Sequence, residues 1–408
     1  MKFLHTADLH LGKVFHEHSL LEDQRHMLRQ LAEILSEPSW EALLIAGDVY
    51  DRSIPSPEAV SLFSGFLGQL KFQRPDLEIL ILPGNHDSAV RLGFGKELFS
   101  ALGIHFVTDP NDAVKPVTVG GGQCSFFLLP FLHPGSLSAR LTAGEPAGAA
   151  SGAASGPEGE TPLRSQAKLA AEAAARLEAA RLEALAAGSR WAVLGAHLFA
   201  GGGQSSESER IFLGSAEQVD LSPFAGFDYT GLGHLHRRQQ AGERAWYSGS
   251  PLAYSFGEGA QEKSFLQVEL SAGREAAVTP LPVRPLRKLV SLTGSFSYFY
   301  RESVGDPAVG EAEEAYLEVT LTGTDLTANP LPLLRQRFPW ILSVRQNEAF
   351  AALRREAPPG TVISGERRTL ADDFRDFLAG IYGEGFTDDE KTGLFRELLE
   401  EVRAGGPP

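Results

Sequence analysis

Cysteine is almost absent from this 408-residue sequence, which contains only Cys124. A single cysteine can form neither an internal disulfide nor a cysteine-based zinc cluster, so any metal must be bound through His, Asp, Glu or Asn. This scarcity also favours a reducing, cytoplasmic compartment. Long apolar runs are missing too, and without 18 consecutive uncharged apolar residues no membrane span is expected. The opening residues Met1–Asp8 lack a long apolar core, so no signal peptide is expected.

Positive charge is scarce, because 37 Lys and Arg stand against 52 Asp and Glu, which gives a formal net charge of -15. This balance argues mildly against nucleic-acid binding, which commonly uses a basic patch, although net charge does not say where the charges lie. Hydrophobic residues make up 43% of the chain and charged residues 22%, so a full core can form and global disorder is excluded. The length suits two or three domains rather than one.

Short apolar runs rich in Val, Ile and Leu alternate with helix-like segments. Each run is bounded by Gly, Asp, Asn or His, a pattern that predicts buried strands. The predicted strands are Lys2–Thr6, Ala42–Ala46, Glu78–Leu82, Trp191–Gly195 and Tyr229–Leu232. Helical spacing of apolar residues predicts helices over Leu20–Leu35 and Pro57–Leu70. The alternation of strand and helix favours a layered α/β fold.

Changes of composition mark the candidate domain boundaries. Thr142–Pro162 consists only of Ala, Gly, Ser, Pro, Glu and Thr, which predicts a flexible surface insertion. Leu163–Ala187 is rich in Ala, Glu, Arg and Leu and is expected to be a helix. We therefore expect a first domain over residues 1–280 that carries the insertion at 142–162.

A second region begins near Leu281, where two prolines punctuate the chain. It is expected to be a small α/β module over residues 281–357. Its predicted strands and helix are Leu286–Leu292, Ala315–Leu321, Ile341–Arg345 and Pro330–Phe338. After Pro358-Pro359-Gly360, two apolar stripes at helical spacing predict a C-terminal helical segment over residues 365–404, which packs either on this chain or on a partner.

Residues that commonly bind metals follow five of the predicted strands. They are Asp8 and His10, Asp48, Asn85, His197, and His234 with His236. Residues i and i+2 at a strand end point the same way, so each spaced pair can aim at one point. The glycines before Asp48, Asn85 and His234 allow a close approach of the backbone. Because ligands bind where the carboxyl ends of strands meet in α/β sheets, we expect one shared pocket.

This donor set indicates the metal and the chemistry. Imidazole, carboxylate and amide oxygen without thiolate suit manganese or iron, and zinc to a lesser degree. Seven donors are too many for one four-coordinate ion, whereas two ions about 3.5–4 Å apart, bridged by Asp48, would use them to hydrolyse a phosphoryl ester. His86 should point away from the ion that Asn85 binds and toward the substrate, and Asp87 is expected to hold its ring in the protonated form.

In this order, the motifs resemble those of the calcineurin-like metallophosphoesterase superfamily, and within it the branch of double-strand-break repair nucleases. The finer matches lie at His5–Lys13, His197–Phe199, Ser206–Arg210, Gly233–Arg237, Tyr247–Pro251 and Ser255–Glu258. The likeness covers Met1–Leu292 well and the C-terminal part only in outline. It implies a β-sandwich flanked by helices, a small α/β capping domain that helps to place DNA, and C-terminal helices.

The resemblance also implies an activity and its site. The activity would be a manganese-dependent exonuclease on DNA ends that also cuts single strands endonucleolytically, in hairpin cleavage, repair and recombination. One ion would be held by Asp8, His10, Asp48 and His236, and the other by Asp48, Asn85, His197 and His234. His86 would be the catalytic histidine with Asp87 beside it. The partners would be DNA and an SMC-type ATPase on which the C-terminal segment docks, with a homodimer inside a heterotetramer in the bacterial cytoplasm and nucleoid.

Other interpretations remain open. The same metal site would serve a phosphodiesterase or phosphomonoesterase on small substrates, or a non-catalytic assembly protein that keeps a relic site. His5, His105 and His133 have no acidic or Asn neighbour at motif spacing and are interpreted as structural. Asp51 is interpreted as a turn or supporting residue, and the aromatic cluster Phe296–Tyr300 as core rather than a base-stacking surface.

Overall fold

The computed structural model describes residues 1–140, 160–201, 218–303, 306–322, 329–346 and 395. One compact unit spans Met1–Gln346. Most of the predicted insertion, the motif Ser206–Arg210 and the C-terminal segment 365–404, apart from Phe395, lie outside the described residues. No helix in the described part of the chain is both long and apolar enough to cross a membrane.

Two six-stranded sheets form the larger part of this unit. The first has the order β16 (Ala277–Pro282), β15 (Ser264–Glu269), β1 (Lys2–Thr6), β4 (Ala42–Ala46), β5 (Glu78–Leu82) and β6 (Ile104–Phe106). The second has the order β13 (Gln239–Gln240), β14 (Ala245–Tyr247), β12 (Tyr229–Gly233), β11 (Trp191–His197), β8 (Cys124–Leu129) and β7 (Val117–Val119). Neighbours pair in parallel from β1 to β6 and from β14 to β8, and the outer pairings are antiparallel.

A hydrophobic cluster joins residues of the two sheets and forms the centre of the fold. The ring of Phe3 in β1 packs edge-on against Phe126 at 5.1 Å and against Tyr229 at 5.6 Å, measured between ring centroids. All three rings are fully buried. Strands buried on both faces are expected to be continuously apolar, which holds for β4 throughout and for β8 except at the buried Ser125.

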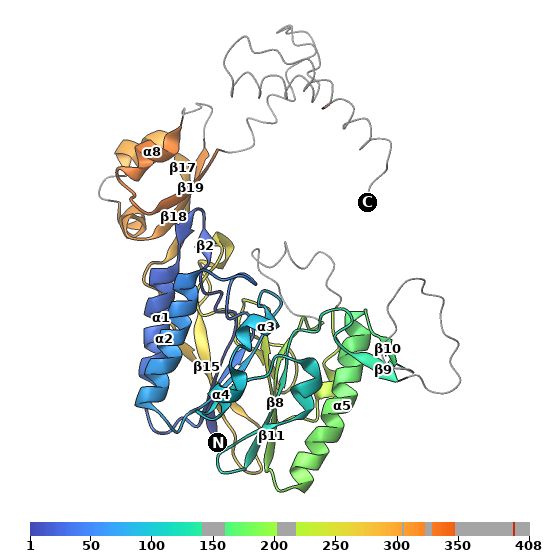
Figure 1. Ribbon diagram of the computed structural model, residues 1–408. Helices are drawn as coiled ribbons and strands as arrows, with labels where there is room; N and C mark the ends of the chain where they lie inside the picture. Colours follow the sequence, from blue (N-terminus) through green and yellow to red (C-terminus); the bar gives the residue numbers. More distant parts are fainter. Residues whose placement is uncertain (141–159, 202–217, 304–305, 323–328, 347–394, 396–408) are drawn as a thin grey trace. The chain divides into compact units, whose positions relative to one another are not determined.

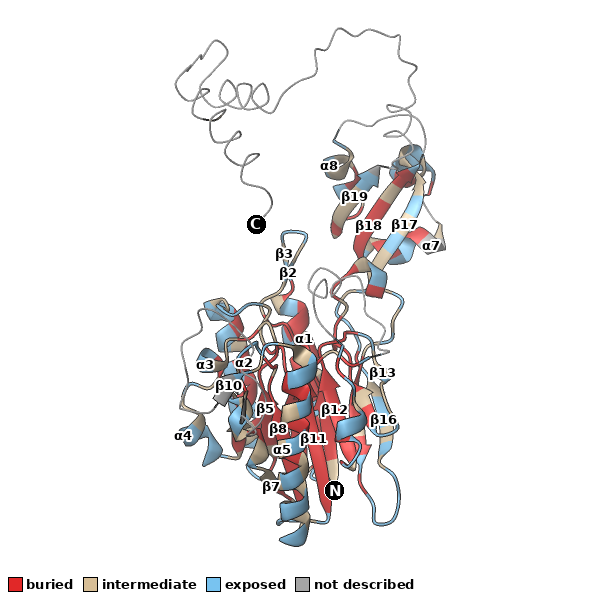
Figure 2. Ribbon diagram, turned by 90° about the vertical axis from the view of Figure 1, so that its right-hand side faces the viewer, coloured by how far each residue is buried: buried red, intermediate tan, exposed pale blue. Residues whose placement is uncertain are grey.

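Helices cover the outer face of each sheet (Figure 1). On the first sheet lie α1 (Leu21–Leu35) and α2 (Pro57–Gln73), whose apolar faces share a cluster with β4 and β5. The α2 helix begins where the Ser56 side chain accepts a hydrogen bond from the Ala59 amide. On the second sheet lies the alanine-rich α5 (Gln166–Ala186). Figure 2 shows buried strands between helices with exposed outer faces, so the predicted layered α/β fold is confirmed.

A smaller parallel sheet follows, made of β17 (Leu289–Ser295), β18 (Tyr316–Thr322) and β19 (Ile341–Gln346). With α8 (Pro330–Arg335) it encloses its own hydrophobic cluster, in which Phe299 is buried. The three predicted strands and the helix of this region are therefore present, while the boundaries at 281 and 357 stay a prediction. The hydroxyl of Tyr316 donates to a carboxylate oxygen of Asp23 at 2.7 Å, which ties this sheet to α1.

The remaining elements are short. They are β2 (Val14–Phe15), β3 (His18–Ser19), α3 (Ala89–Leu92), α4 (Lys96–Ser100), η1 (Pro110–Val114), β9 (Ser138–Arg140), β10 (Glu160–Pro162), η2 (Ser222–Phe224), η3 (Phe256–Glu258), η4 (Tyr298–Glu302), α7 (Pro307–Gly310) and η5 (Glu311–Glu313). Glu160–Pro162 pairs with β9, so the end of the predicted insertion is a strand rather than a flexible segment.

Candidate metal centre

The carboxyl ends of β1, β4, β5, β11 and β12 meet, and the segments that follow them carry the predicted donors. Backbone hydrogen bonds fix these segments to one another. The Asp8 amide donates to the carbonyl oxygen of Gly47 at 3.0 Å, and the His10 amide donates to the carbonyl oxygen of Asp48 at 3.0 Å. Across the two sheets, the His234 amide lies 3.0 and 3.1 Å from the carboxylate oxygens of Asp8. The loops therefore form one assembly, as the strand-end argument predicted.

Asp8, His10 and His236 form one group, whose metal-binding atoms all lie within 4.8 Å of one another. The Nε2 atoms of His10 and His236 are 3.1 Å apart. His10 Nε2 is also 3.8 Å from Oδ2 of Asp48. All four side chains are buried.

The second group is centred on Asn85. Its side-chain oxygen lies 3.0 Å from Nε2 of His197 and 3.0 Å from Nδ1 of His234. His197 Nε2 is also 3.5 Å from Oδ2 of Asp48. Asp48 thus faces both groups, which is the geometry that a bridging carboxylate requires.

Positive φ angles occur at four of the seven donors: 55° at Asp8, 44° at His10, 48° at Asp48 and 106° at His234. Each such residue other than glycine costs about 1–3 kcal/mol, and strain of this kind concentrates at functional sites. These angles also show that the donors do not follow the expected alternation of side chains, in which residues i and i+2 of a strand point the same way. Asp8 and His10 converge through a left-handed turn beyond β1, while the rings of His234 and His236 turn to different partners, Asn85 and His10.

Two glycines allow the loops to come this close. A Cβ on Gly84 would lie 2.1 Å from Oδ1 of Asp48, and a Cβ on Gly233 would lie 1.9 Å from the carbonyl oxygen of Ala46. Neither contact is possible for another residue without moving backbone. Gly84 and Gly233, which precede Asn85 and His234, are therefore required because the loops pack closely against each other.

Burial sets the protonation of the imidazoles. It lowers the pKa of His197 to about 3 and holds the pKa values of His10 and His234 well below their ordinary value. The same burial raises the pKa of Asp48. Neutral imidazoles have a free lone pair, which is the form that binds metals.

The hydrogen bonds of His197 test whether a cation fits. Its Nδ1 lies 2.9 Å from the carbonyl oxygen of Ala46 and must donate to it, so Nε2 carries a lone pair. That lone pair faces the side-chain oxygens of Asn85 and Asp48, which are acceptors as oriented here. In addition, His234 Nε2 is buried without a hydrogen-bond partner among the described residues. A divalent cation satisfies such a set of converging acceptors, so the donors fit a metal.

Glu258 supports the centre, although no role was predicted for it from the sequence. Its side chain is fully buried, and Oε1 lies 3.5 Å from Nδ1 of His236. Lys263 balances this charge through a 2.6 Å contact with Oε2 and donates to the His236 carbonyl oxygen at 2.9 Å. The Ser255 hydroxyl donates to Oε1 at 3.0 Å. Glu258 ends the Ser255–Glu258 motif, which contributes to the family resemblance but does not by itself indicate a contact with His236.

His86 and Asp87 differ from expectation in their contacts. Asp87 was predicted to hold the His86 ring, but its carboxylate accepts the backbone amides of Val49, Tyr50 and Gly84 at 2.9–3.0 Å. Burial and the neighbouring Asp48 raise the Asp87 pKa to about 7. The His86 ring is fixed by the Asp51 carbonyl oxygen, 2.9 Å from Nδ1, and its Nε2 lies 4.0 Å from Oδ2 of Asp48 rather than pointing away.

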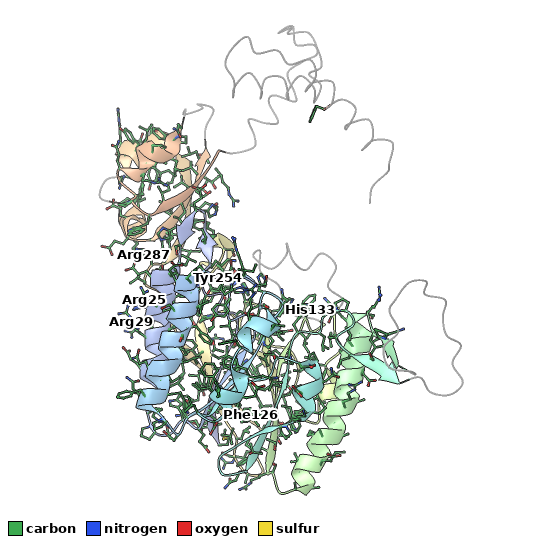
Figure 3. All side chains as sticks on the ribbon, in the orientation of Figure 1. Arg25, Arg29, Phe126, His133, Tyr254 and Arg287 are labelled. Atoms are coloured by element: carbon green, nitrogen blue, oxygen red, sulfur yellow. The ribbon has the colours of Figure 1, made fainter. Side chains whose placement is uncertain are left out.

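Other residues near the centre have supporting contacts. The Asp51 carboxylate lies 2.8 Å from Nζ of Lys13 and 3.6 Å from Nδ1 of His10, which agrees with a supporting role. Tyr254, labelled in Figure 3, donates its hydroxyl to the Leu9 carbonyl oxygen. His5 is buried against the Tyr229 hydroxyl, 2.9 Å from its Nδ1, as expected of a structural histidine.

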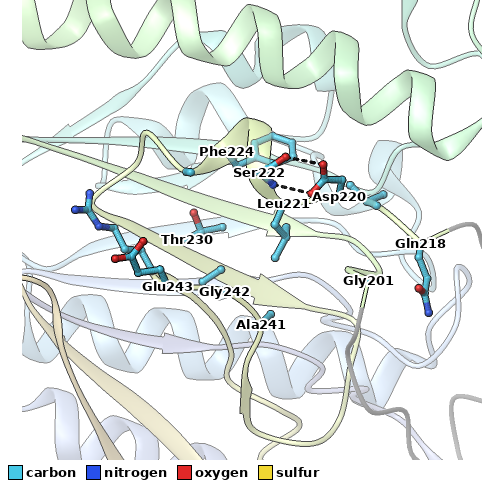
Figure 4. Close-up of a pocket in the computed structure, with 14 residues that line it drawn as sticks. Gly201, Gln218, Asp220, Leu221, Ser222, Phe224, Thr230, Ala241, Gly242 and Glu243 are labelled. Carbon is cyan, nitrogen blue, oxygen red and sulfur yellow. Dashed lines mark hydrogen bonds between the residues drawn. The ribbon is translucent and has the colours of Figure 1, made fainter.

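A separate cavity of about 660 Å³ lies beside η2 and the β13–β14 hairpin (Figure 4). Ser222 donates to the Asp220 carboxylate at its edge. None of the predicted donors lines it, and Gly201 and Gln218 border residues outside the described part of the chain. The predicted donors therefore lie at the strand ends and not beside this cavity.

Comparison with known proteins agrees with the layered α/β fold. Residues 1–137 match the family model described as calcineurin-like phosphoesterase. A solved dimetal phosphatase from Danio rerio, with 11% identity and a TM-score of 0.40 over 70% of this chain and 97% of its own, is too distant to support an argument. Residues 1–137 therefore form a domain of the calcineurin-like phosphoesterase class.

Two bacterial proteins define the family more closely, and both are named as the SbcD component of the nuclease SbcCD. The one from Staphylococcus epidermidis is 29% identical over 346 residues, or 84% of this chain and 85% of its own. The one from Staphylococcus saprophyticus is 30% identical over 352 residues, or 86% of this chain and 85% of its own. The chain belongs to the SbcD family of nuclease subunits.

Proposed function

We propose that this chain hydrolyses phosphodiester bonds in DNA as the nuclease subunit of an SbcCD-type complex. The observation that carries the proposal is the convergence of seven donor side chains from five strand ends into two groups that share Asp48. Membership of the SbcD family supplies the substrate, because the relatives' name describes a nuclease.

The proposed site holds two divalent ions, with manganese as the metal. One ion would be held by Asp8, His10, Asp48 and His236, and the other by Asp48, Asn85, His197 and His234. Such ions supply Lewis-acid chemistry, because they withdraw charge from a phosphate oxygen and make water a nucleophile near neutral pH. The chain's contribution is to keep the imidazoles neutral by burial and to hold every donor on a cross-linked loop.

His86 is the proposed catalytic histidine. Its Nδ1–H is held by the Asp51 carbonyl oxygen, which leaves Nε2 beside Asp48 at the edge of the centre. A protonated Nε2 in this position can donate to the leaving oxygen of the substrate. Asp87, predicted to act beside it, contributes by tying the Asp48 loop to the Asn85 loop through backbone amides.

The partners follow from the family. The relatives' name describes one subunit of a two-component complex, so we propose that an SbcC-like SMC-type ATPase binds this chain through residues 365–404 and that residues 281–357 help to place DNA. A homodimer inside the heterotetramer is supported by four exposed apolar side chains on α3, on α4 and in the turns that follow these helices. Val90, Phe94, Leu98 and Leu102, which repeat every four residues, are 87%, 84%, 78% and 60% exposed.

End-labelled duplex, hairpin and single-stranded DNA, incubated with manganese or magnesium, test the function. We expect manganese-stimulated degradation of duplex ends and endonucleolytic cuts in single strands, both lost with chelator. The ATPase subunit with ATP should increase activity on duplex DNA. Rapid turnover of a small phosphate ester with intact DNA would instead favour the small-substrate phosphodiesterase.

A further inference from the structure

A phenyl ring packs against the histidines of the candidate metal centre without belonging to the core. Phe131, in the segment after β8, lies 6.3 Å from the His234 ring at an interplanar angle of 27° and 6.2 Å from the His197 ring. The ring of His133 packs edge-on against the Phe131 ring at 4.9 Å. Phe131 is half-buried and His133, labelled in Figure 3, is exposed.

The backbone at Phe131 is fixed by the residues around it and not by burial of the Phe131 ring in a core. Its amide donates to the Pro83 carbonyl oxygen at 3.1 Å, beside the Gly84-Asn85 turn, and the next residue, Leu132, is buried in the core over the second sheet. Phe131 itself belongs to none of the hydrophobic clusters of the described residues. The half-buried ring of Phe131 therefore contributes to no core, and an aromatic ring beside a phosphate-binding site can stack on a base.

Phe199 provides the contrast. Its ring lies 6.0 Å from the His234 ring, which is as close as that of Phe131. However, Phe199 packs against the cluster beneath α5, so its position is explained by folding. Of these two rings, Phe131 alone combines contact with the donor histidines and absence from the core.

We propose that Phe131, supported by His133, is a stacking surface for the nucleobase of the nucleotide whose phosphate enters the metal centre. This inference rests on the proposed nuclease function and assigns its substrate contact. One sugar separates a phosphate from its base, so a ring next to the donor histidines is within reach of that base. Stacking on a phenyl ring suits every base, which an enzyme that degrades DNA of any sequence requires. The site would therefore bind a nucleotide with an unpaired base.

The test compares a single-stranded oligonucleotide with copies that carry one abasic residue at successive positions around the cleaved bond. The full chain is used with manganese, as wild type, Phe131→Leu and Phe131→Trp. Phe72→Leu is the matched control, because Phe72 is a phenyl that is 90% exposed in the last turn of α2. Manganese binding is measured by calorimetry, and oligonucleotide binding by fluorescence anisotropy without metal.

We expect one abasic position to lower kcat/KM of the wild type about tenfold, equivalent to about 1.4 kcal/mol. Phe131→Leu should show a similar loss on normal DNA, no further loss on that abasic copy, and unchanged manganese binding. Phe131→Trp and Phe72→Leu should resemble the wild type.

Three results would overturn the stacking surface while leaving the nuclease intact. These are no effect of any abasic position, an equal loss by Phe131→Leu on normal and abasic DNA, or weakened manganese binding by Phe131→Leu. A wild type that cleaves no DNA would refute the proposed function instead. The anisotropy measurement would then test the stacking surface by itself. If Phe131 stacks on a base, the wild type binds the normal oligonucleotide more tightly than the abasic one, and Phe131→Leu removes that preference.

Discussion

At the scale of single residues, the centre depends on side chains behind the donors as much as on the donors. The Glu258 carboxylate faces Nδ1 of His236, which leaves the Nε2 of that ring toward His10. Partners of this kind fix the tautomer and orientation of a metal-binding imidazole. Lys263 keeps the buried carboxylate compensated, because an unpaired buried charge would be strongly destabilising.

We predict that Glu258→Gln weakens manganese binding by about 10–100-fold, the usual cost of losing such a partner. Calorimetric titration of the chelator-treated chain measures this. Glu262→Gln is the matched control, because this neighbouring acid is exposed. Equal affinities for the two variants would show that Glu258 serves only the local fold.

Asp48 and His86 lie side by side, and substitutions should separate their roles. Asp48→Ala should abolish cleavage and weaken manganese binding by more than Glu258→Gln does, since it removes the carboxylate that faces both groups. His86→Ala should retain both ions and lower kcat by about 10²–10⁴-fold, the usual contribution of a general acid. Metal content and single-turnover cleavage are measured on each variant. If both variants lose metal equally, His86 is a ligand.

At the scale of elements, α3 and α4 carry apolar side chains that the described part of the chain leaves exposed. Isolated exposed apolar residues are ordinary, but a row of four along one segment, Val90, Phe94, Leu98 and Leu102, favours an interface. Both helices are too short to be stable alone, and they were not predicted from the sequence because four or five residues give no periodic pattern.

We predict that Phe94→Glu makes the chain monomeric in light scattering after gel filtration, because it places a charge at the centre of this row. Manganese binding should stay unchanged, since the row contains no donor. Leu182→Glu, at an exposed leucine of α5 on the second sheet, is the control and should leave the oligomeric state as in the wild type. A Phe94→Glu chain of unchanged mass would refute this interface.

At the scale of the whole molecule, the sequence predicted well what depends on local pattern. β1, β4 and β5 were predicted at their observed bounds because each is a short apolar run with turn residues on both sides. The residues alone did not indicate how the strands divide between two facing sheets, since no local signal says which strands pair. The support of His236 by Glu258 was missed for a similar reason, because 22 positions separate them and only the fold buries the carboxylate.

The whole fold should also respond to the metal. The donors come from residues as distant as Asp8 and His236, so ions that bind only the folded state stabilise all the loops together. We predict that manganese, at one fixed concentration of about 100 times its dissociation constant for the wild type, raises the free energy of unfolding of the chelator-treated wild type by about 2.7 kcal/mol per independent site. Urea unfolding monitored by tryptophan fluorescence measures this. Phe72→Leu should show the same gain and Asp48→Ala almost none, because the strained loops then keep their cost without the cation that offsets it. A gain of equal size in Asp48→Ala would place the stabilising metal elsewhere and would leave the two groups around Asp48 without a chemical role.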